Sequence, residues 1–149
     1  MTTFKRTNSQ NPDLPVLIKL LDEDLQIRDG AEHSFYAQFN KLDNIQHVII
    51  CYIENQAIGC GAFKPYDQHC IEVKRMFVKL DYRGKSIGLH ILNELEIWAA
   101  ELNYTSAILE TGNKQPEAIR LYEKAGYKII KNFGQYKNVQ NSVCMARDF

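Results

Sequence analysis

The chain has 149 residues, of which 45% are hydrophobic and 24% are charged. This length and composition are typical of one folded domain, which we place over residues 1–149, and they exclude a disordered chain. The 18 basic and 18 acidic residues give a formal net charge of zero. Because no overall field attracts a polyanion or an anionic surface, we expect neither nucleic acid nor a membrane as a partner.

The sequence predicts neither a membrane span nor a metal site. No stretch approaches the roughly 18 consecutive apolar residues that cross a bilayer, and the polar residues 1–11 do not form a secretory signal peptide. The four cysteines, Cys51, Cys60, Cys70 and Cys144, show no C-x-x-C spacing and no paired histidines. We interpret them as reduced, mostly buried thiols, which predicts a cytoplasmic protein.

The N-terminal part of the chain predicts a strand followed by two helices. Residues 3–7 are typical of a short strand, and Asn11-Pro12-Asp13 is a helix-capping sequence ahead of an apolar pattern. Leucine and isoleucine then recur at spacings of three and four, which places them on one helical face. Arg28-Asp29-Gly30 interrupts this helix, and residues 31–41 predict a second, shorter one.

Three apolar segments rich in β-forming residues follow, over residues 47–53, 57–63 and 70–80. The connections between them are too short to cross over a sheet, so the segments predict an antiparallel meander. A polar, glycine-containing loop over residues 81–88 comes next. The remaining predicted elements, which complete one mixed α/β domain, are a long helix over 87–102, a strand over 105–110, a helix over 115–125, and strands over 127–130 and 142–146.

The loop Tyr82-Arg83-Gly84-Lys85-Ser86-Ile87-Gly88 carries the clearest chemical signal. A glycine-bearing loop that enters a helix directs several backbone N–H groups, and the positive end of the helix dipole, at one point. That arrangement suits a phosphate group, and a tight turn with solvated basic residues is the alternative interpretation. A Walker A loop is excluded, because it needs glycine at the position of Lys79.

Two stretches, in this order, resemble the GNAT acyltransferase superfamily. The first is E-V-K-R-M-F-V-K-L-D-Y-R-G-K-S-I-G, which contains most of an R/Q-x-x-G-x-G/A motif ahead of the long helix. The second is L-E-T-G-N-K-Q-P-E-A-I-R-L-Y-E-K-A-G-Y, similar to the family's A-x-x-L-Y-E-x-x-G-[FY] stretch. The resemblance is strongest over residues 71–130. It implies a twisted, mostly antiparallel sheet of six to seven strands, flanked by about four helices.

This resemblance implies acetyl-CoA as the cosubstrate, without a metal. The pantetheine arm is expected beside the strand that precedes the loop, at Met76 and Val78. Gln115 stands where relatives often place an asparagine that contacts this arm, and a helix-cap role explains it nearly as well. Ser86 replaces the first motif glycine. A left-handed backbone there costs serine about 1–2 kcal/mol, whereas a position that needs only a small residue leaves the hydroxyl free to bind phosphate. The expected diphosphate ligands are the backbone amides of Arg83, Gly84, Lys85, Ser86, Ile87 and Gly88.

The resemblance also implies two catalytic residues. Tyr122 matches the tyrosine that many relatives use as the general acid toward the departing thiolate, although its apolar helical neighbours also fit a place in the core. Glu72 lies six residues before Val78, where some relatives carry a glutamate that activates the amine directly or through water. The alternative for Glu72 is a surface charge paired with Lys74 or Arg75, and strand alternation does not decide its face if a bulge intervenes.

We expect acceptor specificity to come from the first two helices and their junction, which form one wall of the acceptor cleft in this family. Arg28, His33 and Tyr36 are the candidate acceptor-binding residues, Arg28 as a clamp for a carboxylate and His33 as a base. Solvated surface side chains are the alternative. The aromatic loop over residues 132–136 is a further candidate for closing over the acceptor.

The sequence therefore predicts an N-acetyltransferase that moves an acetyl group from acetyl-CoA to a primary amine of a small molecule. Direct transfer in a ternary complex is expected, because no cysteine lies in a recognisable nucleophile context. Two alternatives stay open: a protein N-terminal or lysine acetyltransferase, and a CoA-binding regulatory module without turnover. A homodimer is a possible assembly.

Overall fold

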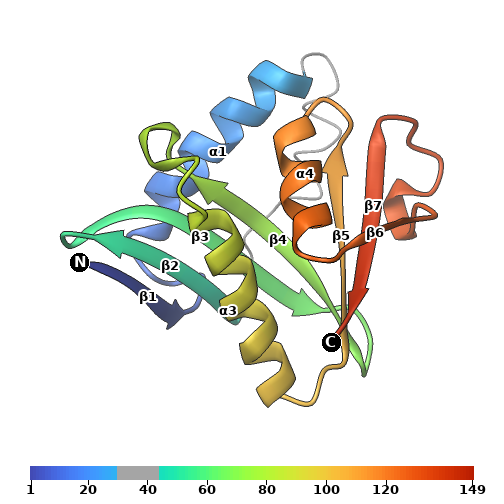
Figure 1. Ribbon diagram of the computed structural model, residues 1–149, viewed down its shortest axis with the longest axis horizontal. Coiled ribbons are helices and arrows are strands. Elements are labelled where there is room, and N and C mark those ends of the chain that lie inside the picture. Colours follow the sequence, from blue (N-terminus) through green and yellow to red (C-terminus); the bar gives the residue numbers. More distant parts are fainter. Residues whose placement is uncertain (30–43) are drawn as a thin grey trace.

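The computed structural model describes residues 1–29 and 44–149, which form a seven-stranded sheet with three α-helices packed against it (Figure 1). The elements are β1 (Thr2–Thr7), α1 (Leu14–Asp29), β2 (His47–Ile53), β3 (Gln56–Pro65), β4 (Cys70–Val78), the 3-10 turn η2 (Leu80–Tyr82), α3 (Ile87–Glu101), β5 (Ser106–Gly112), α4 (Pro116–Lys124), β6 (Lys128–Ile130), the 3-10 turn η3 (Gly134–Tyr136) and β7 (Ser142–Asp148). The helix expected over residues 31–41 lies outside the described residues.

The strands lie in the order β1-β2-β3-β4-β5-β7-β6. Each neighbouring pair is antiparallel except β4 and β5, which run parallel. The predicted meander and the mostly antiparallel sheet are therefore confirmed. None of the helices in the two described ranges is both long and apolar enough to cross a membrane.

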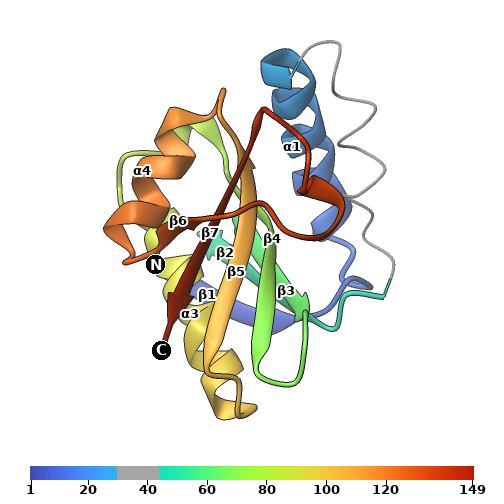
Figure 2. The ribbon, with the colours of Figure 1, turned by 90° about the vertical axis from the view of Figure 1, so that its right-hand side faces the viewer.

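Helices cover both faces of the sheet, so the domain has three layers. Side chains of a strand alternate between faces, and on β2 the residues Ile49 and Cys51 join the apolar cluster with α3, whereas Val48 and Ile50 join the cluster with α1. Tyr122 places α4 on the same face as α3. Figure 2 shows α3 and α4 on one side of the sheet and α1 on the other. The centre of the sheet is therefore buried on both faces.

A β-bulge interrupts β4. Cys60 and Ala62 on β3 pair with Phe77 and Lys74, so that two residues of β4 oppose one residue of β3. The first of these two, Arg75, has a left-handed backbone with a φ of 59°. Because a bulge adds one residue to the strand, side-chain alternation changes phase at this point. The bulge therefore decides which face each half of β4 presents, a question that the sequence pattern left open.

The parallel strands β4 and β5 pair only at their N-terminal ends. Their register runs from Cys70 opposite Ser106 to Glu72 opposite Ile108, although β4 continues to Val78. Beyond this short ladder the two strands diverge (Figure 1). The main-chain groups of β4 that face β5 are thus left without a ladder partner from the described strands.

The strand predicted over residues 70–80 is shorter in the structure. β4 ends at Val78, and the chain then turns through η2, where the Tyr82 N–H donates to the Lys79 carbonyl at 2.9 Å. Leu80, whose apolar side chain lengthened the predicted strand, is 74% exposed. An apolar residue at the start of a turn was therefore misread as the end of a strand.

The strand predicted over residues 105–110 is longer in the structure and ends at Gly112. Its last two residues, Thr111 and Gly112, pair with Val143 and Ser142 of β7. A Thr-Gly pair is typical of a turn, but pairing across the sheet overrides this local preference. The extension brings Thr111 and Gly112 to the open end of the gap between β4 and β5.

Candidate active site

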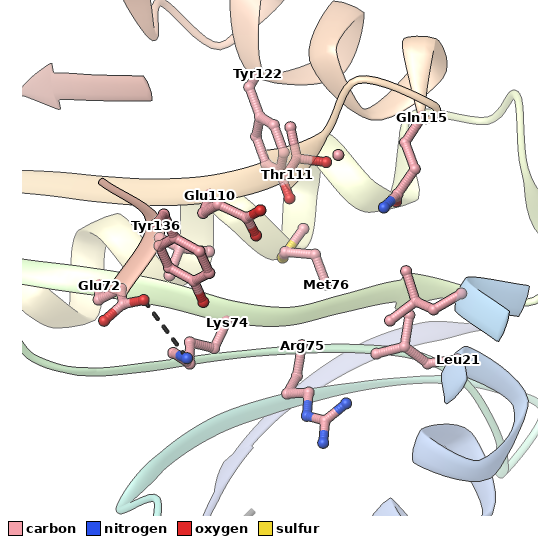
Figure 3. Close-up of a pocket in the computed structure, with 13 residues that line it drawn as sticks. Leu21, Glu72, Lys74, Arg75, Met76, Glu110, Thr111, Gln115, Tyr122 and Tyr136 are labelled. Carbon is pink, nitrogen blue, oxygen red and sulfur yellow. Dashed lines mark ion pairs between the residues drawn. The ribbon is translucent and has the colours of Figure 1, made fainter. Parts of the chain in front are cut away.

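A cavity opens where β4 and β5 diverge. Its volume is about 90 Å³, and its walls come from α1, β4, β5, α4 and the η3 turn. Four residues predicted from the sequence, Glu72, Met76, Gln115 and Tyr122, line this cavity together (Figure 3). The fold thus brings together residues that are far apart in the sequence, such as Glu72 and Tyr122, which are 50 positions apart.

Glu72 is a buried carboxylate in the β4 wall of the cavity. It is 5% exposed, and its carboxylate oxygens lie 3.5 Å from Nζ of Lys74 and 4.0 Å from Nζ of Lys64 on β3. Burial lowers the pKa of Lys74, while the Glu72 charge opposes that shift. Glu72 therefore pairs with Lys74, as the alternative interpretation of this residue expected. The pair lies inside the cavity, however, and not on the surface.

Tyr122 projects from α4 toward the same cavity (Figure 3). It is 6% exposed and belongs to the apolar cluster between α3 and the sheet, with its ring centre 6.0 Å from that of Tyr127. Burial, together with the negative charge of Glu110, raises the pKa of the Tyr122 phenol. The phenol therefore stays protonated at alkaline pH and is available as a proton donor.

Glu110 and Tyr136 are two further ionisable residues of the cavity lining; Glu110 was missed, whereas Tyr136 belongs to the aromatic loop expected to close over the acceptor. Glu110 on β5 accepts a hydrogen bond of 2.7 Å from the Ser142 hydroxyl on β7. Tyr136 in η3 is 2% exposed, and burial raises its pKa, with the charges of Glu110 and Glu72 adding to the rise. The aromatic loop over residues 132–136 was the sequence signal for Tyr136. Glu110 gave none, because a charge near the end of an apolar strand is common.

The loop between β4 and α3 presents main-chain N–H groups at the start of the helix. In the described part of the chain, the N–H groups of residues 84–88 have no hydrogen-bond partner, and the first bond of the helix runs from the His90 N–H to the Ser86 carbonyl at 3.0 Å. The Arg83 N–H is already used, because it donates to the Leu80 carbonyl at 3.2 Å. Free N–H groups at a helix N-terminus are suited to binding an anion.

Ser86 decides between the two expectations for the motif glycine position. It is the N-cap of α3, has φ 63° and ψ 17°, and makes no side-chain cap hydrogen bond. The position therefore requires a left-handed backbone and not only a small side chain.

We expect Ser86→Gly to raise the free energy of unfolding by about 0.5–1 kcal/mol. Glycine adopts the left-handed conformation without the steric cost of a Cβ atom, and its larger loss of chain entropy offsets part of that gain. Thermal denaturation measures the change. Ser86→Ala, which keeps the Cβ atom and removes the hydroxyl, is the control and should show no gain. A Ser86→Gly protein no more stable than wild type would contradict the assignment of strain to this residue.

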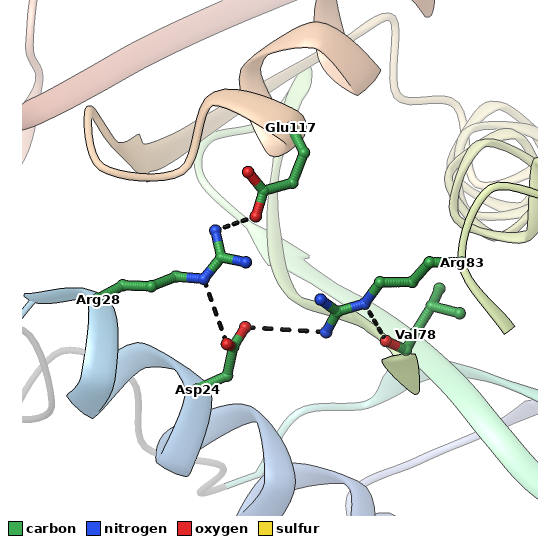
Figure 4. Close-up of polar contacts among 5 residues, drawn as sticks. All are labelled: Asp24, Arg28, Val78, Arg83 and Glu117. Carbon is green, nitrogen blue, oxygen red and sulfur yellow. Dashed lines mark hydrogen bonds and ion pairs between the residues drawn. The ribbon is translucent and has the colours of Figure 1, made fainter. Parts of the chain in front are cut away.

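An ionic network joins α1, α4 and the loop that precedes α3 (Figure 4). Nε of Arg83 donates to the Val78 carbonyl at 2.7 Å, and its Nη2 lies 3.8 Å from the Asp24 carboxylate. Asp24 also accepts a hydrogen bond of 3.2 Å from Arg28, which in turn forms an ion pair with Glu117. The Arg28 guanidinium, expected to clamp an acceptor carboxylate, is therefore already paired with two carboxylates of the protein. The Val78 carbonyl, expected beside the pantetheine arm, already accepts from Arg83.

The other predicted site residues have different surroundings. Gln115 is the N-cap of α4 but makes no side-chain cap hydrogen bond, and it lines the cavity. Lys85 is exposed, with Nζ 5.7 Å from the centre of the Tyr82 ring. His33 and Tyr36, predicted to bind the acceptor, lie outside the described residues.

Comparison with known proteins gives consistent matches. A family model described as the acetyltransferase (GNAT) family matches residues 14–127. An IAA acetyltransferase from Azospirillum brasilense is 39% identical over 80 residues, which are 53% of this chain and 52% of that protein. The structure of a Klebsiella pneumoniae protein classed as an acyl-CoA N-acyltransferase has a TM-score of 0.83 and 25% identity, covering 99% of this chain and 97% of that one. A GNAT family acetyltransferase from Elizabethkingia anophelis, with acetyl-CoA bound, has a TM-score of 0.70 and 18% identity over 99% and 98% of the two chains.

The matches differ in how much of each protein they cover. This chain spans about half the length of the curated relatives it matches, for example 48% and 52% of two of them. The family model, in contrast, covers most of this chain and includes the loop before α3, both diverging strands and Tyr122. The likeness in fold extends over nearly the whole chain. The chain therefore belongs to the acetyltransferase (GNAT) family.

Proposed function

We propose that this protein is an acetyl-CoA-dependent N-acetyltransferase that acts on a primary amine. The observation that carries the proposal is the set of free N–H groups before α3, next to a cavity that holds a buried carboxylate and a buried phenol. A diphosphate at the helix N-terminus leaves the pantetheine arm of CoA to extend along the open side of β4 toward the cavity. The structural neighbour with acetyl-CoA bound supports this choice of cosubstrate.

Each proton transfer in the proposed reaction has a candidate side chain. An alkylammonium group, with a pKa near ~10.4, must lose a proton before it attacks, and Glu72 accepts that proton. The neutral nitrogen then bonds to the thioester carbonyl carbon, and the carbon–sulfur bond breaks. Tyr122 protonates the departing CoA thiolate, and the second proton that the nitrogen loses restores the phenol. Glu72 finally releases its proton to solvent, so that the products are the amide, free CoA and one proton.

Direct transfer from acetyl-CoA to the amine is proposed over a covalent acetyl-enzyme. All four cysteines are buried. Burial raises the pKa of Cys51 to about 11 and that of Cys60 to about 12, and it also raises the pKa of Cys70 and Cys144. A thiolate is the nucleophilic form of cysteine, so buried thiols of this kind are poor acetyl carriers. Both substrates must therefore be bound at the same time.

The proposed acceptor is a small molecule. The cavity is only about 90 Å³ in volume, and four of its ionisable lining residues, Glu72, Lys74, Tyr122 and Tyr136, are each no more than 8% exposed. A peptide needs an open groove for the residues on either side of the acetylated amine, whereas a small amine enters a narrow cavity alone. The size and burial of the cavity thus favour a small amine.

Asp24→Asn is expected to tighten CoA binding about two- to threefold. In the structure the Arg83 guanidinium is paired with Asp24 and with the Val78 carbonyl. Weakening a partly exposed ion pair of this kind is worth about 0.2–1 kcal/mol, and it releases Arg83 toward the diphosphate and the carbonyl toward the pantetheine arm. Isothermal titration calorimetry with CoA measures the Kd. Glu23→Gln, an exposed change on the same helix, is the control for the lost negative charge, and equal tightening in both variants would contradict the specific role of Asp24.

A panel of amines tests the proposed function. The full-length protein is mixed with acetyl-CoA and, separately, with small primary amines and with lysine-containing and free N-terminal peptides, and the release of free CoA thiol is followed. The proposal predicts turnover with at least one small amine and far slower turnover with peptides. Faster turnover of peptides would contradict the small-molecule acceptor and indicate that the acceptor is a protein. Tight CoA binding without thiol release across the panel would favour a regulatory module and overturn the enzymatic proposal.

A further inference from the structure

The pairing of Lys74 with Glu72 supports an inference that rests on the proposed function. We propose that Lys74 is a positioning residue whose ammonium group keeps the Glu72 carboxylate ionised and oriented within the cavity, so that Glu72 is ready to take the proton of the acceptor. Lys74 then acts on the reaction only through Glu72.

The geometry of β4 brings these two side chains together. Glu72 and Lys74 lie two residues apart on the same face of the strand, with the Lys74 amine turned toward Glu72 (Figure 3). The bulge begins at the next residue, and Arg75 turns away to pair with Asp22 on α1 at 3.0 Å. Lys74 is therefore the last cationic residue of β4 that is still in phase with Glu72.

The burial of the pair makes the contact important for the charge of Glu72. Glu72 is 5% exposed and Lys74 is 8% exposed, so neither charge is well solvated. A buried carboxylate is strongly disfavoured unless an opposite charge compensates it. Burial itself lowers the pKa of Lys74, which is consistent with a site of low polarity. A contact of 3.5 Å between opposite charges is strong in such surroundings.

The other charged or titratable groups around Glu72 in the described residues are weaker candidates for this role. Lys64 on β3 lies 4.0 Å from Glu72, but its side chain is 47% exposed and is screened by water. Glu110 on β5 carries the same charge and opposes ionisation. The Tyr136 phenol in η3, the Tyr122 phenol on α4 and the Cys144 thiol on β7 are neutral, because burial raises the pKa of each. α1 contributes only leucines to the lining of the cavity.

The test follows the titration of Glu72 directly. Full-length protein labelled with ¹³C at the glutamate carboxyl carbons is titrated by NMR in the presence of CoA, and Glu72→Gln identifies the signal. Relative to wild type, Lys74→Met should move the Glu72 midpoint up by about one pH unit or more. Lys74→Arg, which keeps the charge, should restore most of the wild-type behaviour. Lys64→Met is the matched control on the other lysine and should move the midpoint by less than about 0.3 units.

A kinetic measurement links this titration to catalysis. With the most reactive amine of the panel, the acid limb of kcat/KM should move to higher pH in Lys74→Met, lowering kcat/KM about tenfold on that limb and less than about threefold on the plateau. Protonation of the free amine contributes equally to the pH profile of every variant. Any difference between the profiles therefore comes from ionisable groups of the protein. Thermal denaturation confirms folding, and Lys74→Gln serves if Lys74→Met does not fold.

The outcomes separate this inference from the proposed function. An unchanged Glu72 titration in a folded Lys74→Met or Lys74→Gln protein overturns the inference, even where Glu72→Gln is inactive. An equally large shift of the Glu72 midpoint in Lys64→Met overturns the inference as well. The effect would then come from the loss of any nearby positive charge and not from Lys74 specifically. Full activity in Glu72→Gln instead removes Glu72 as the base, and with it the positioning role of Lys74.

Discussion

Tyr122→Phe is expected to lower kcat for acetyl transfer about 100-fold while leaving the Kd of CoA within about threefold. The change removes the proton donor for the departing thiolate but keeps the ring, which is 6% exposed and packed in the core. Because burial and the charge of Glu110 raise the pKa of Tyr122, the wild-type phenol remains protonated through the alkaline range. The loss in Tyr122→Phe should therefore be nearly constant between about pH 7 and 9. Steady-state rates at saturating substrates, with calorimetry for CoA, measure both effects.

Tyr127→Phe is the matched control for Tyr122. Tyr127 is 2% exposed, its ring centre lies 6.0 Å from that of Tyr122, and its hydroxyl donates to the buried Glu96 carboxylate at 2.8 Å. Its removal should lower the free energy of unfolding by about 1–3 kcal/mol and leave kcat within about threefold, because Tyr127 does not line the cavity. Equal losses of kcat in the two variants, or an unchanged kcat in Tyr122→Phe, would remove Tyr122 from the mechanism.

Glu72→Gln is expected to lower kcat/KM about 100-fold near neutral pH. The amide keeps the shape of the carboxylate but does not accept a proton from the acceptor ammonium. The deficit should shrink to less than about tenfold above pH 10, where the acceptor amine loses its proton in solution. A purely structural defect has no reason to recover in this way. The pH dependence of kcat/KM, measured beside thermal denaturation, distinguishes the two.

Glu110→Gln is the comparison that makes the assignment of Glu72 specific. Both carboxylates line the cavity, one from each of the two diverging strands, and Glu110 is held by the Ser142 hydroxyl at 2.7 Å. We expect Glu110→Gln to lower kcat/KM less than about tenfold, because Glu110 is proposed to influence the site only by its charge. A larger loss in Glu110→Gln than in Glu72→Gln, with recovery at high pH, would assign the base to Glu110.

The fold was largely predictable because most neighbouring strands of the sheet are also consecutive in the sequence. Apolar segments rich in β-forming residues, joined by short connections, predicted the meander of β2, β3 and β4. The Asn11 cap predicted the start of α1, where the Asp13 N–H donates to the Asn11 side chain at 2.9 Å. The bulge was not predictable, because arginine rarely adopts the left-handed backbone found at Arg75. The contact of Arg75 with Asp22 is made across the fold, and no local pattern reveals it.

The candidate site was predictable only where a motif carried the information. Glu72 and Tyr122 were placed by family spacing, and the structure brings both to one cavity. Tyr136 reaches that cavity from the C-terminal hairpin, through an arrangement that residue order alone does not specify. The backbone amide of Arg83 was expected at a diphosphate, but in the structure it donates to the Leu80 carbonyl, and the Arg83 side chain contacts Asp24 and a strand carbonyl. Contacts between distant elements thus account for the main differences from expectation.

The most direct test of the central claim follows the main-chain amides of the loop before α3. The ¹⁵N-labelled full-length protein is titrated with CoA and, separately, with pantetheine, which lacks the diphosphate. If the loop binds the diphosphate, CoA should shift the amide signals of residues 84–88 most strongly, whereas pantetheine should leave these signals in place and shift those of the cavity. Saturable CoA binding with unmoved signals from residues 84–88, or the absence of CoA binding, would contradict the account.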